Sequence, residues 1–272
     1  PGKPPEIEAF HQERPAPREK GWLYGIHAVL AALANPRRQC RRLLVTEETQ
    51  QKQNDQISDL LNRRKDISQA ERVPRSEIDA LFPEGAVHQG IAIQIRPLPS
   101  LSLHDLLKKA EKTEARQDEK QVVVLLDQVN DPHNVGAILR STAALGGLAV
   151  VLTDRHAPEA GPVLAKAASG ALETVPLIRT PNLVRAMDDL KQAGFWCVGL
   201  DSYGEESLAA CKLPDRIALI LGAEGKGLRR LTRKNCDFMV KIPLSDSGVG
   251  APSSLNVSNA AAIALYELLA RK

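Results

Sequence analysis

Short apolar runs alternate with longer segments of helical periodicity from Gln121 onward, and this alternation limits the possible folds more than any other feature. Strands buried on both faces of a parallel sheet are apolar almost throughout, and each is followed by a covering helix. The sequence therefore predicts an α/β domain with a parallel sheet. The expected strands are 122–126, 148–152, 175–178, 195–200, 217–221 and 238–242, and the expected helices are 134–145, 159–169, 181–192, 227–235 and 255–270.

Three further segments precede this domain. Residues 1–20 contain five prolines and mixed charges, which favours a disordered tail. Residues 21–97 form a smaller α/β block, with expected helices at 25–33, 52–63 and 74–81 and expected strands at 42–46 and 90–95. Residues 98–120 are rich in charge and are interpreted as a solvated helix and a linker, so the domain proper spans 121–272.

Composition excludes several classes of protein. The chain has 272 residues, of which 43% are hydrophobic and 25% charged, as in a soluble globular protein. No apolar run reaches the roughly 18 residues that a membrane span needs, and no signal peptide is expected. The four cysteines are scattered and form no C-x-x-C pair, so neither zinc nor a disulfide framework is indicated. We expect a cytoplasmic protein with no metal and no membrane partner.

Positive charge is local rather than global, because the net charge is only +3. Phosphate contacts depend on such local charge, although each cluster could equally be a solvated surface. With 3% aromatic residues, an aromatic platform for base stacking is not expected. The clusters in the N-terminal block comprise Arg37, Arg38, Arg41, Arg42, Arg63 and Arg64; another comprises Arg229, Arg230, Arg233 and Lys234.

The first of three unusual polar segments, residues 130–141, follows the first strand of the larger domain. Asn134 lies where a helix should begin, so it is either an N-cap or a side chain that faces a ligand. Gly136 keeps that first turn thin enough for a ligand to approach. Arg140 lies six residues later on another helical face. It is either a surface residue, paired with Asp127 or Asp131, or a functional one.

The second segment, 221–227, and the third, 253–258, flank the later part of the domain. The second is neither a P-loop nor a dinucleotide-binding fingerprint. Its three glycines permit positive φ or a close approach of backbone to a ligand, and Glu224 lies among them. An ordinary strand-to-helix turn is the alternative. In the third segment, Asn256 precedes a helix of small residues, which it could simply cap.

Taken in this order and spacing, over about the last 150 residues, the three segments resemble the SpoU (TrmH) family of S-adenosylmethionine-dependent RNA ribose 2′-O-methyltransferases. The resemblance implies a trefoil knot in place of an open doubly wound sheet, and a homodimer formed through the C-terminal domain. It also implies catalytic roles for Asn134, Arg140, Glu224 and Asn256, and cofactor contacts at Gly222, Ile242, Leu244 and Leu255. In the family the arginine is often given as the general base. A guanidinium stays protonated, so alkoxide stabilisation or a phosphate contact is left open.

The N-terminal block resembles the RNA-binding domain of one subgroup of this family, which is similar in fold to ribosomal protein L30e. The resemblance is carried by Tyr24-Gly-Ile-His-Ala-Val and His88-Gln-Gly-Ile. It implies methylation of a large-subunit rRNA, at a guanosine of 23S rRNA. The alternatives are a tRNA ribose methyltransferase of the same family and a catalytically silent RNA-binding protein of ribosome assembly.

Two expectations concern connecting segments. Residues 245–252 form a loop longer than in similar proteins, which is either a substrate gate or a harmless insertion. The N-terminal block is expected to move as an RNA-grasping module on its linker. A chain beginning near Asp118 should then fold without it.

Overall fold

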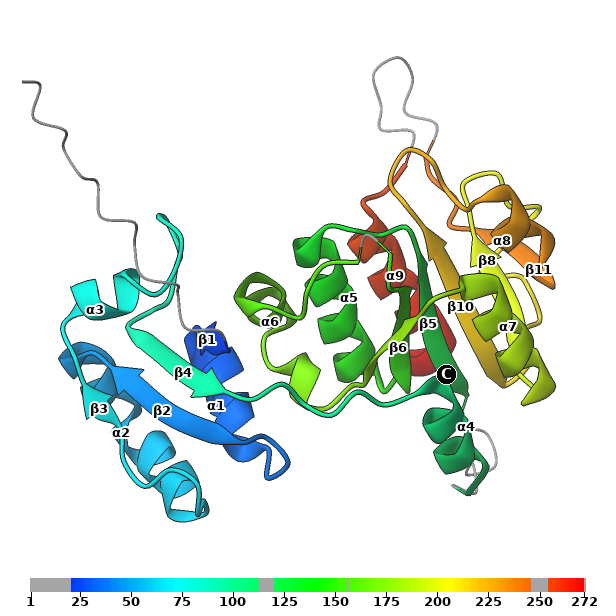
Figure 1. The fold of residues 1–272 in the computed structure, drawn as a ribbon. Coiled ribbons are helices and arrows are strands. Elements are labelled where there is room, and N and C mark those ends of the chain that lie inside the picture. The colour runs from blue at the N-terminus through cyan, green and yellow to red at the C-terminus, as the bar shows by residue number, and fades with distance from the viewer. Residues whose placement is uncertain (1–20, 113–119, 156, 246–253, 272) are drawn as a thin grey trace, which may run out of the picture.

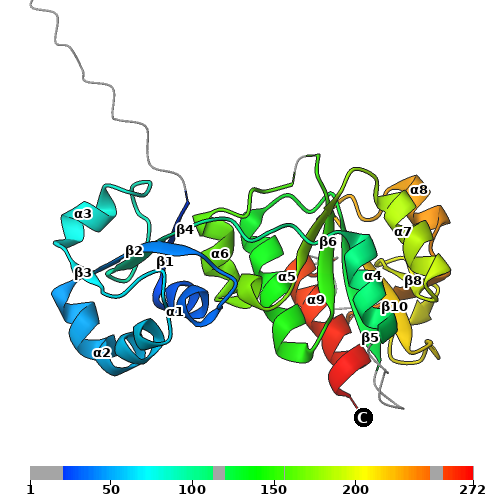
Figure 2. The ribbon, with the colours of Figure 1, turned by 60° about the horizontal axis from the view of Figure 1, so that its bottom comes forward.

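The computed structural model describes residues 21–112, 120–155, 157–245 and 254–271 (Figure 1). The expected tail at 1–20 and all but the first residue of the expected long loop at 245–252 therefore lie outside the described residues. The described chain forms two sheets, a four-stranded one and a seven-stranded one. Figures 1 and 2 show them as two units lying side by side.

The larger unit holds the seven-stranded sheet. Its strands are β5 (Gln121–Asp127), β6 (Ala149–Thr153), β7 (Leu177–Thr180), β8 (Trp196–Leu200), β9 (Glu206–Ser207), β10 (Arg216–Gly222) and β11 (Phe238–Lys241). Its helices are α4 (Leu103–Lys112), α5 (Pro132–Leu145), α6 (Pro162–Ala168), α7 (Leu183–Gln192), α8 (Arg230–Lys234) and α9 (Val257–Leu265). A 3₁₀ turn, η1 (Ala171–Glu173), follows α6, and a π-helical turn, η2 (Tyr266–Ala270), follows α9.

The predicted parallel sheet with helices on both faces is confirmed. The strand order is β7-β6-β5-β10-β8-β11-β9, and every pairing in this sheet is parallel. Alternate residues of β5 face opposite layers: Val122 and Val124 pack with α5, α6 and α9, whereas Val123 and Leu125 pack with α4 and α7. Both layers are visible in Figure 2, with α5 and α9 on one side and α4 and α7 on the other.

The smaller unit has the strand order β1-β4-β2-β3. Its strands are β1 (Trp22–Tyr24), β2 (Cys40–Val45), β3 (Glu71–Arg72) and β4 (Ile91–Ile95), and its helices are α1 (Ile26–Ala34), α2 (Glu47–Asn62) and α3 (Arg75–Asp79). β4 pairs antiparallel with β1 and β2, and β2 pairs parallel with β3. The apolar face of α1 and the strands form one core.

The segment predicted to hold a solvated helix and a linker contains α4, but this helix buries Leu106 and Leu107 against the larger sheet. A shortened chain therefore has to retain α4, and a start near Asp118 would uncover the apolar face beneath it. The interpretation of the N-terminal block as a mobile module is also corrected. Ala165 of α6 is 3% exposed and belongs to the core of the smaller unit, so the two units pack directly together.

Candidate functional site

The carboxyl ends of β5, β10, β8 and β11 meet at one edge of the larger sheet, because these neighbouring strands are parallel. Ligands of open α/β sheets bind at this edge. The loop after β10 carries Glu224, and the segments after β5 and before α9 carry Asn134 and Asn256. The fold therefore brings the three unusual sequence segments to one place.

Three side chains from these segments form one hydrogen-bonded cluster, which we call the amide–carboxylate cluster. Asn134 Nδ2 donates to Glu224 Oε1 at 3.3 Å, and Asn256 Nδ2 donates both to Asn134 Oδ1 at 3.0 Å and to Glu224 Oε1. The Val257 main-chain N–H also reaches Glu224 Oε1, at 3.3 Å. Glu224 and Asn256 are exposed and Asn134 is half-buried, so the cluster remains accessible from solvent.

The first turn of α5 presents Asn134 without using it as a cap. Asp131 is the N-cap, accepting from the His133 N–H at 3.0 Å, and Pro132 occupies the first turn. The capping alternative for Asn134 is therefore wrong, and its amide is available to the cluster. Gly136 does not open the turn to a ligand, because a Cβ there would lie 2.5 Å from the Ala167 Cβ of α6. This glycine permits close packing of two helices.

Asn256 has two roles. It is the N-cap of α9, and its Oδ1 accepts from the Ser258 and Asn259 N–H groups at 2.9 and 3.3 Å. Because Oδ1 is engaged by the helix, Nδ2 is directed to Asn134 and Glu224. The capping role of Asn256 thus leaves its amide nitrogen in the amide–carboxylate cluster.

The loop that carries Glu224 folds back on itself. Gly227 N–H donates to Ala223 O at 2.9 Å, and a Cβ on Gly222 would lie 2.2 Å from the Gly227 carbonyl carbon. Gly225 and Gly227 have φ of 73° and 62°, a region that favours glycine. The glycines therefore serve this tight loop, which fixes the backbone of Glu224 against the end of β10.

Two buried carboxylates that the sequence analysis did not select support this loop. Asp127, at the end of β5, is fully buried and accepts from Arg229 N and Nε at 3.0 and 2.6 Å. Asp201, directly after β8, pairs with Arg233 at 2.5 Å. Arg229 and Arg233, both from the basic cluster at 229–234, thus anchor α8 to the sheet. An acidic residue at the end of an apolar strand was the available signal.

Arg140 forms no hydrogen bond with the amide–carboxylate cluster. It is exposed on α5, and within the described residues its guanidinium makes no hydrogen bond or ion pair. Asp127 pairs with Arg229 and Asp131 caps α5, so neither is the partner suggested by the sequence. The side chain is consequently available for an anionic group brought by a ligand.

The positions expected to contact a cofactor, Gly222, Ile242, Leu244 and Leu255, lie around the same edge. Gly222 ends β10, Ile242 directly follows β11, and Leu255 immediately precedes the cap of α9. Ile242 and Leu255 are half-buried, and Leu244 is 42% exposed. Uncovered apolar side chains beside a polar cluster suit a ligand with one flat apolar part and one polar part.

The six arginines predicted to bind RNA differ in their exposure. Arg37, Arg41 and Arg63 are exposed. Arg42 pairs with Glu71 at 2.7 Å while remaining 42% exposed. Arg38 and Arg64 have side chains only 6% exposed and are fully engaged in internal contacts. The prediction of phosphate contacts is therefore wrong for these two buried arginines.

The cysteine thiols of this chain are poorly suited to nucleophilic chemistry. Burial raises the pKa of the Cys197 and Cys236 thiols to about 12 and that of Cys40 to about 11, so these thiols stay protonated at neutral pH. Among the described residues there is no group of three or more histidine, cysteine or acidic side chains that could hold a metal ion. Nor does the described part of the chain contain a helix that could span a membrane.

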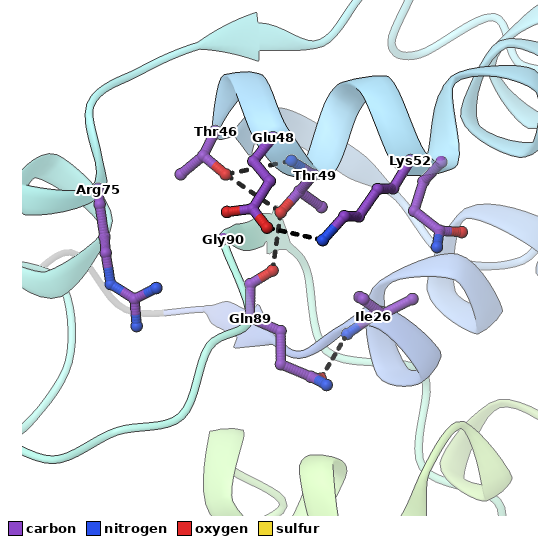
Figure 3. Close-up of a pocket in the computed structure, with 9 residues that line it drawn as sticks. Ile26, Thr46, Glu48, Thr49, Lys52, Arg75, Gln89 and Gly90 are labelled. Atoms are coloured by element: carbon purple, nitrogen blue, oxygen red, sulfur yellow. Dashed lines mark hydrogen bonds and ion pairs between the residues drawn. The ribbon is translucent and has the colours of Figure 1, made fainter.

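The smaller unit has a separate surface cavity of about 240 Å³, between the N-terminal turns of α1 and α2 and the loop at Gln89 (Figure 3). Its lining groups already bond to one another. Lys52 pairs with Glu48 at 2.6 Å, and the Thr49 hydroxyl donates to Gln89 O at 2.9 Å. None of the residues that line this cavity belongs to the amide–carboxylate cluster.

Comparison with known proteins agrees with this geometry. Residues 121–266 match the SpoU rRNA Methylase family, and residues 22–101 match the family described as RNA 2′-O ribose methyltransferase substrate binding. The chain is 37% identical to the 23S rRNA (guanosine-2′-O-)-methyltransferase RlmB of Photobacterium profundum, over 92% of this chain and 97% of the relative. It is 36% identical to the protein of the same name from Pseudomonas putida, over 92% and 96% of the two chains.

Solved structures show the same fold. The SpoU methyltransferase AviRb from Streptomyces viridochromogenes, in complex with the cofactor AdoMet, superposes with a TM-score of 0.71 at 24% identity, over 92% of this chain and 89% of that chain. An AdoMet-bound rRNA methyltransferase from Sinorhizobium meliloti gives a TM-score of 0.67 at 21% identity, over 91% and 86% of the two chains.

Proposed function

The chain belongs to the SpoU rRNA Methylase family, and from this membership we propose that it methylates the ribose 2′-hydroxyl of a guanosine in 23S rRNA. The observation that carries the proposal is the amide–carboxylate cluster. Its side chains come from segments separated by 90 and 32 residues, and they converge at the sheet edge where ligands bind. The guanosine and the 23S rRNA follow the names of the relatives.

The residues at the sheet edge fit S-adenosylmethionine, the family's cofactor. Bound there, it supplies a methyl group on a sulfonium centre, which is already a good leaving group. Ile242, Leu244 and Leu255 offer apolar cover for a purine, and the rigid loop after Gly222 forms a wall beside them. This assignment of the cofactor contacts is part of the proposal.

The chain's own residues must place the ribose and favour its oxyanion. Holding the reacting groups in line can supply several kcal/mol, and donors aimed at the developing charge add a few more. We assign ribose placement to Asn134 and Asn256, whose amides Glu224 orients through Oε1. Arg140 stabilises the alkoxide or holds a phosphate, because a guanidinium offers a planar fork of donors and that of Arg140 makes no hydrogen bond or ion pair within the described residues.

Three structural features complete the proposal. A trefoil knot is supported by the sheet order, in which β10 lies between β5 and β8, and by the return of α9 to pack on α5 after β11. A homodimer through the C-terminal domain is supported by Ile263 and Tyr266, which are 44% and 57% exposed near the chain's end.

The four-stranded unit, with its exposed arginines, serves as an L30e-like RNA-binding domain. A cytoplasmic location accords with an rRNA substrate.

S-adenosylmethionine should bind to the protein in the absence of RNA. All the groups assigned to the cofactor lie on one chain, and the loop around Gly222 is already closed by its own hydrogen bond. Calorimetric titration with S-adenosylmethionine, and with its demethylated product, measures this affinity. A dissociation constant of about 1 mM corresponds to a binding free energy of only about −4 kcal/mol. Folded protein that shows no heat of binding at roughly millimolar ligand would therefore contradict the cofactor assignment.

Glu224→Gln should lower the rate of methyl transfer by about 100-fold, while the free energy of unfolding changes by less than about 1 kcal/mol. The amide keeps the size and one acceptor oxygen of the carboxylate, but the hydrogen bonds from Asn134 and Asn256 lose the charge that strengthens them. Single-turnover kinetics and urea unfolding measure the two effects. Glu205→Gln, at an exposed carboxylate outside the cluster, is the matched control. A native rate in Glu224→Gln would remove the carboxylate from the mechanism.

A further inference from the structure

The two units share an interface built from α6 and η1 on one side and from α1 and β1 on the other. Ala165 of α6 lies in the core of the smaller unit, and Leu172 of η1 packs against the cores of both units. Gly170 between them has φ of 94°, and a Cβ there would lie 2.6 Å from the Ala31 Cβ of α1. The backbones therefore approach as closely as they do inside a single core.

A buried ion pair joins the two units. The side chains of Arg38 and Glu173 are 6% and 4% exposed. Arg38 Nη2 lies 2.6 Å from Glu173 Oε1, and its Nε lies 3.1 Å from both carboxylate oxygens. Asn35 Nδ2 donates to Glu173 Oε2 at 2.7 Å. Because a planar guanidinium and an amide bind one carboxylate, this contact defines the relative direction of the two units as well as the distance between them.

Contacts within the smaller unit hold the loop that carries Arg38. Arg64 Nη1 donates to Leu33 O at 2.8 Å and to Asn35 O at 3.1 Å, and Nη2 donates to Arg38 O. Arg64 also pairs with Asp66 at 2.8 Å, and this bond holds the pKa of the Asp66 carboxyl below its usual range. The loop that presents Asn35 and Arg38 is thus held by bonds within the smaller unit as well as by Glu173.

A second polar contact fixes the rotation of one unit against the other. Lys166 Nζ donates to Val87 O at 2.7 Å, and the ammonium lies 5.5 Å from the centre of the Tyr24 ring. Two polar contacts at separate points leave little freedom for the smaller unit to swing.

The helix that carries Lys166, α6, also packs on α5, the helix that carries Asn134. The face of α6 opposite the smaller unit packs on α5 at Gly136, where a Cβ would meet Ala167, and Asn134 lies two residues before Gly136. The smaller unit and the helix that carries Asn134 therefore both pack on α6.

We propose that Glu173 is a positioning residue: through Arg38 and Asn35 it fixes the distance and direction from the RNA-binding unit to the active site, and so determines which ribose is methylated. The inference rests on the proposed function. A buried ion pair adds little stability compared with apolar residues of the same volume, so its value here lies in registration.

The test uses the full chain in two variants. Glu173→Gln leaves Arg38 buried without a compensating charge. The double variant Arg38→Met with Glu173→Leu keeps the interface packed, since such replacements are neutral or stabilising, but removes its direction. Asp237→Asn is the matched control, because Asp237 pairs with Lys191 at 2.7 Å within the methyltransferase unit. Each protein is given S-adenosylmethionine and 23S rRNA, and methylated riboses are mapped by mass spectrometry.

Both Glu173 variants should bind S-adenosylmethionine as the native chain does, yet methylate the native ribose up to about 100-fold more slowly and spread methyl groups to neighbouring riboses. Small-angle X-ray scattering should show a larger radius of gyration for Glu173→Gln. The control should lose stability without a change of target. If the Glu173 variants also only lose stability, and keep the native ribose and rate, the ion pair is merely structural and the inference is wrong. If the native chain itself transfers no methyl group, the proposed function fails instead.

Discussion

Replacing Arg140 by alanine should lower the rate of methyl transfer by about 100- to 1000-fold while leaving the affinity for S-adenosylmethionine within about threefold. Arg140 is exposed on α5 and makes no hydrogen bond or ion pair within the described residues, whereas the groups assigned to the cofactor lie at the end of β10 and after β11. Removing the guanidinium therefore removes a partner of the RNA and leaves the cofactor pocket unchanged. Single-turnover rates and calorimetry measure the two quantities.

Arg140→Lys should also be inactive, because a compact ammonium does not reproduce the planar fork of a guanidinium. Arg185→Ala is the control, since Arg185 is equally exposed but lies on α7, on the other face of the sheet. Near-native rates in both Arg140 variants would exclude Arg140 from the catalytic step. A large loss of cofactor affinity would instead place its side chain in the cofactor pocket.

Replacing Arg37, Arg41 and Arg63 together by alanine should weaken RNA binding and lower the slope of log affinity against log salt by about 2 to 3 units. These three arginines are the exposed members of the predicted RNA-binding set in the smaller unit, and none forms an ion pair within the described residues. Each phosphate contact releases condensed counterions, so each lost contact flattens the salt dependence. RNA affinity measured across a salt series gives the slope.

The matched control replaces Arg185, Lys212 and Lys234, which are exposed in the methyltransferase unit. It removes the same formal charge from the chain and should leave the slope unchanged. Curves for the two triple variants that superpose would show that only net charge matters. The arginines of the smaller unit would then be ordinary solvated surface.

The sequence predicts the larger unit well because its strands are buried on both faces. The apolar run at 122–126 corresponds to β5, 217–221 to β10, and the helix expected at 181–192 to α7. β1, β3 and β9 were missed, since strands of two or three residues have no periodicity of their own and form by pairing with longer neighbours. The order of the strands within the parallel sheet is set by tertiary packing.

Polar residues that stand out within their own segment can be selected from the sequence, whereas the distant partner of a buried ion pair cannot. Glu224 and Asn256 were selected because each interrupts a segment of small residues, and they do meet Asn134. The burial of Arg38 depends on Glu173, 135 residues later, and no local pattern identifies that partner. Runs of arginine therefore overpredict phosphate contacts, because the same side chain also suits a buried ion pair.

The central claim is transfer of a methyl group to a ribose, and it is tested most directly by identifying the product. Purified protein is incubated with S-adenosylmethionine and a 23S rRNA transcript, and the RNA is digested to nucleosides for mass spectrometry. The account predicts 2′-O-methylguanosine, at one position, in an alkali-resistant linkage because the 2′-hydroxyl is blocked. The Arg140→Ala variant should give no such product. A methyl group found on a base, or RNA left unmodified by protein that binds S-adenosylmethionine, would contradict the account.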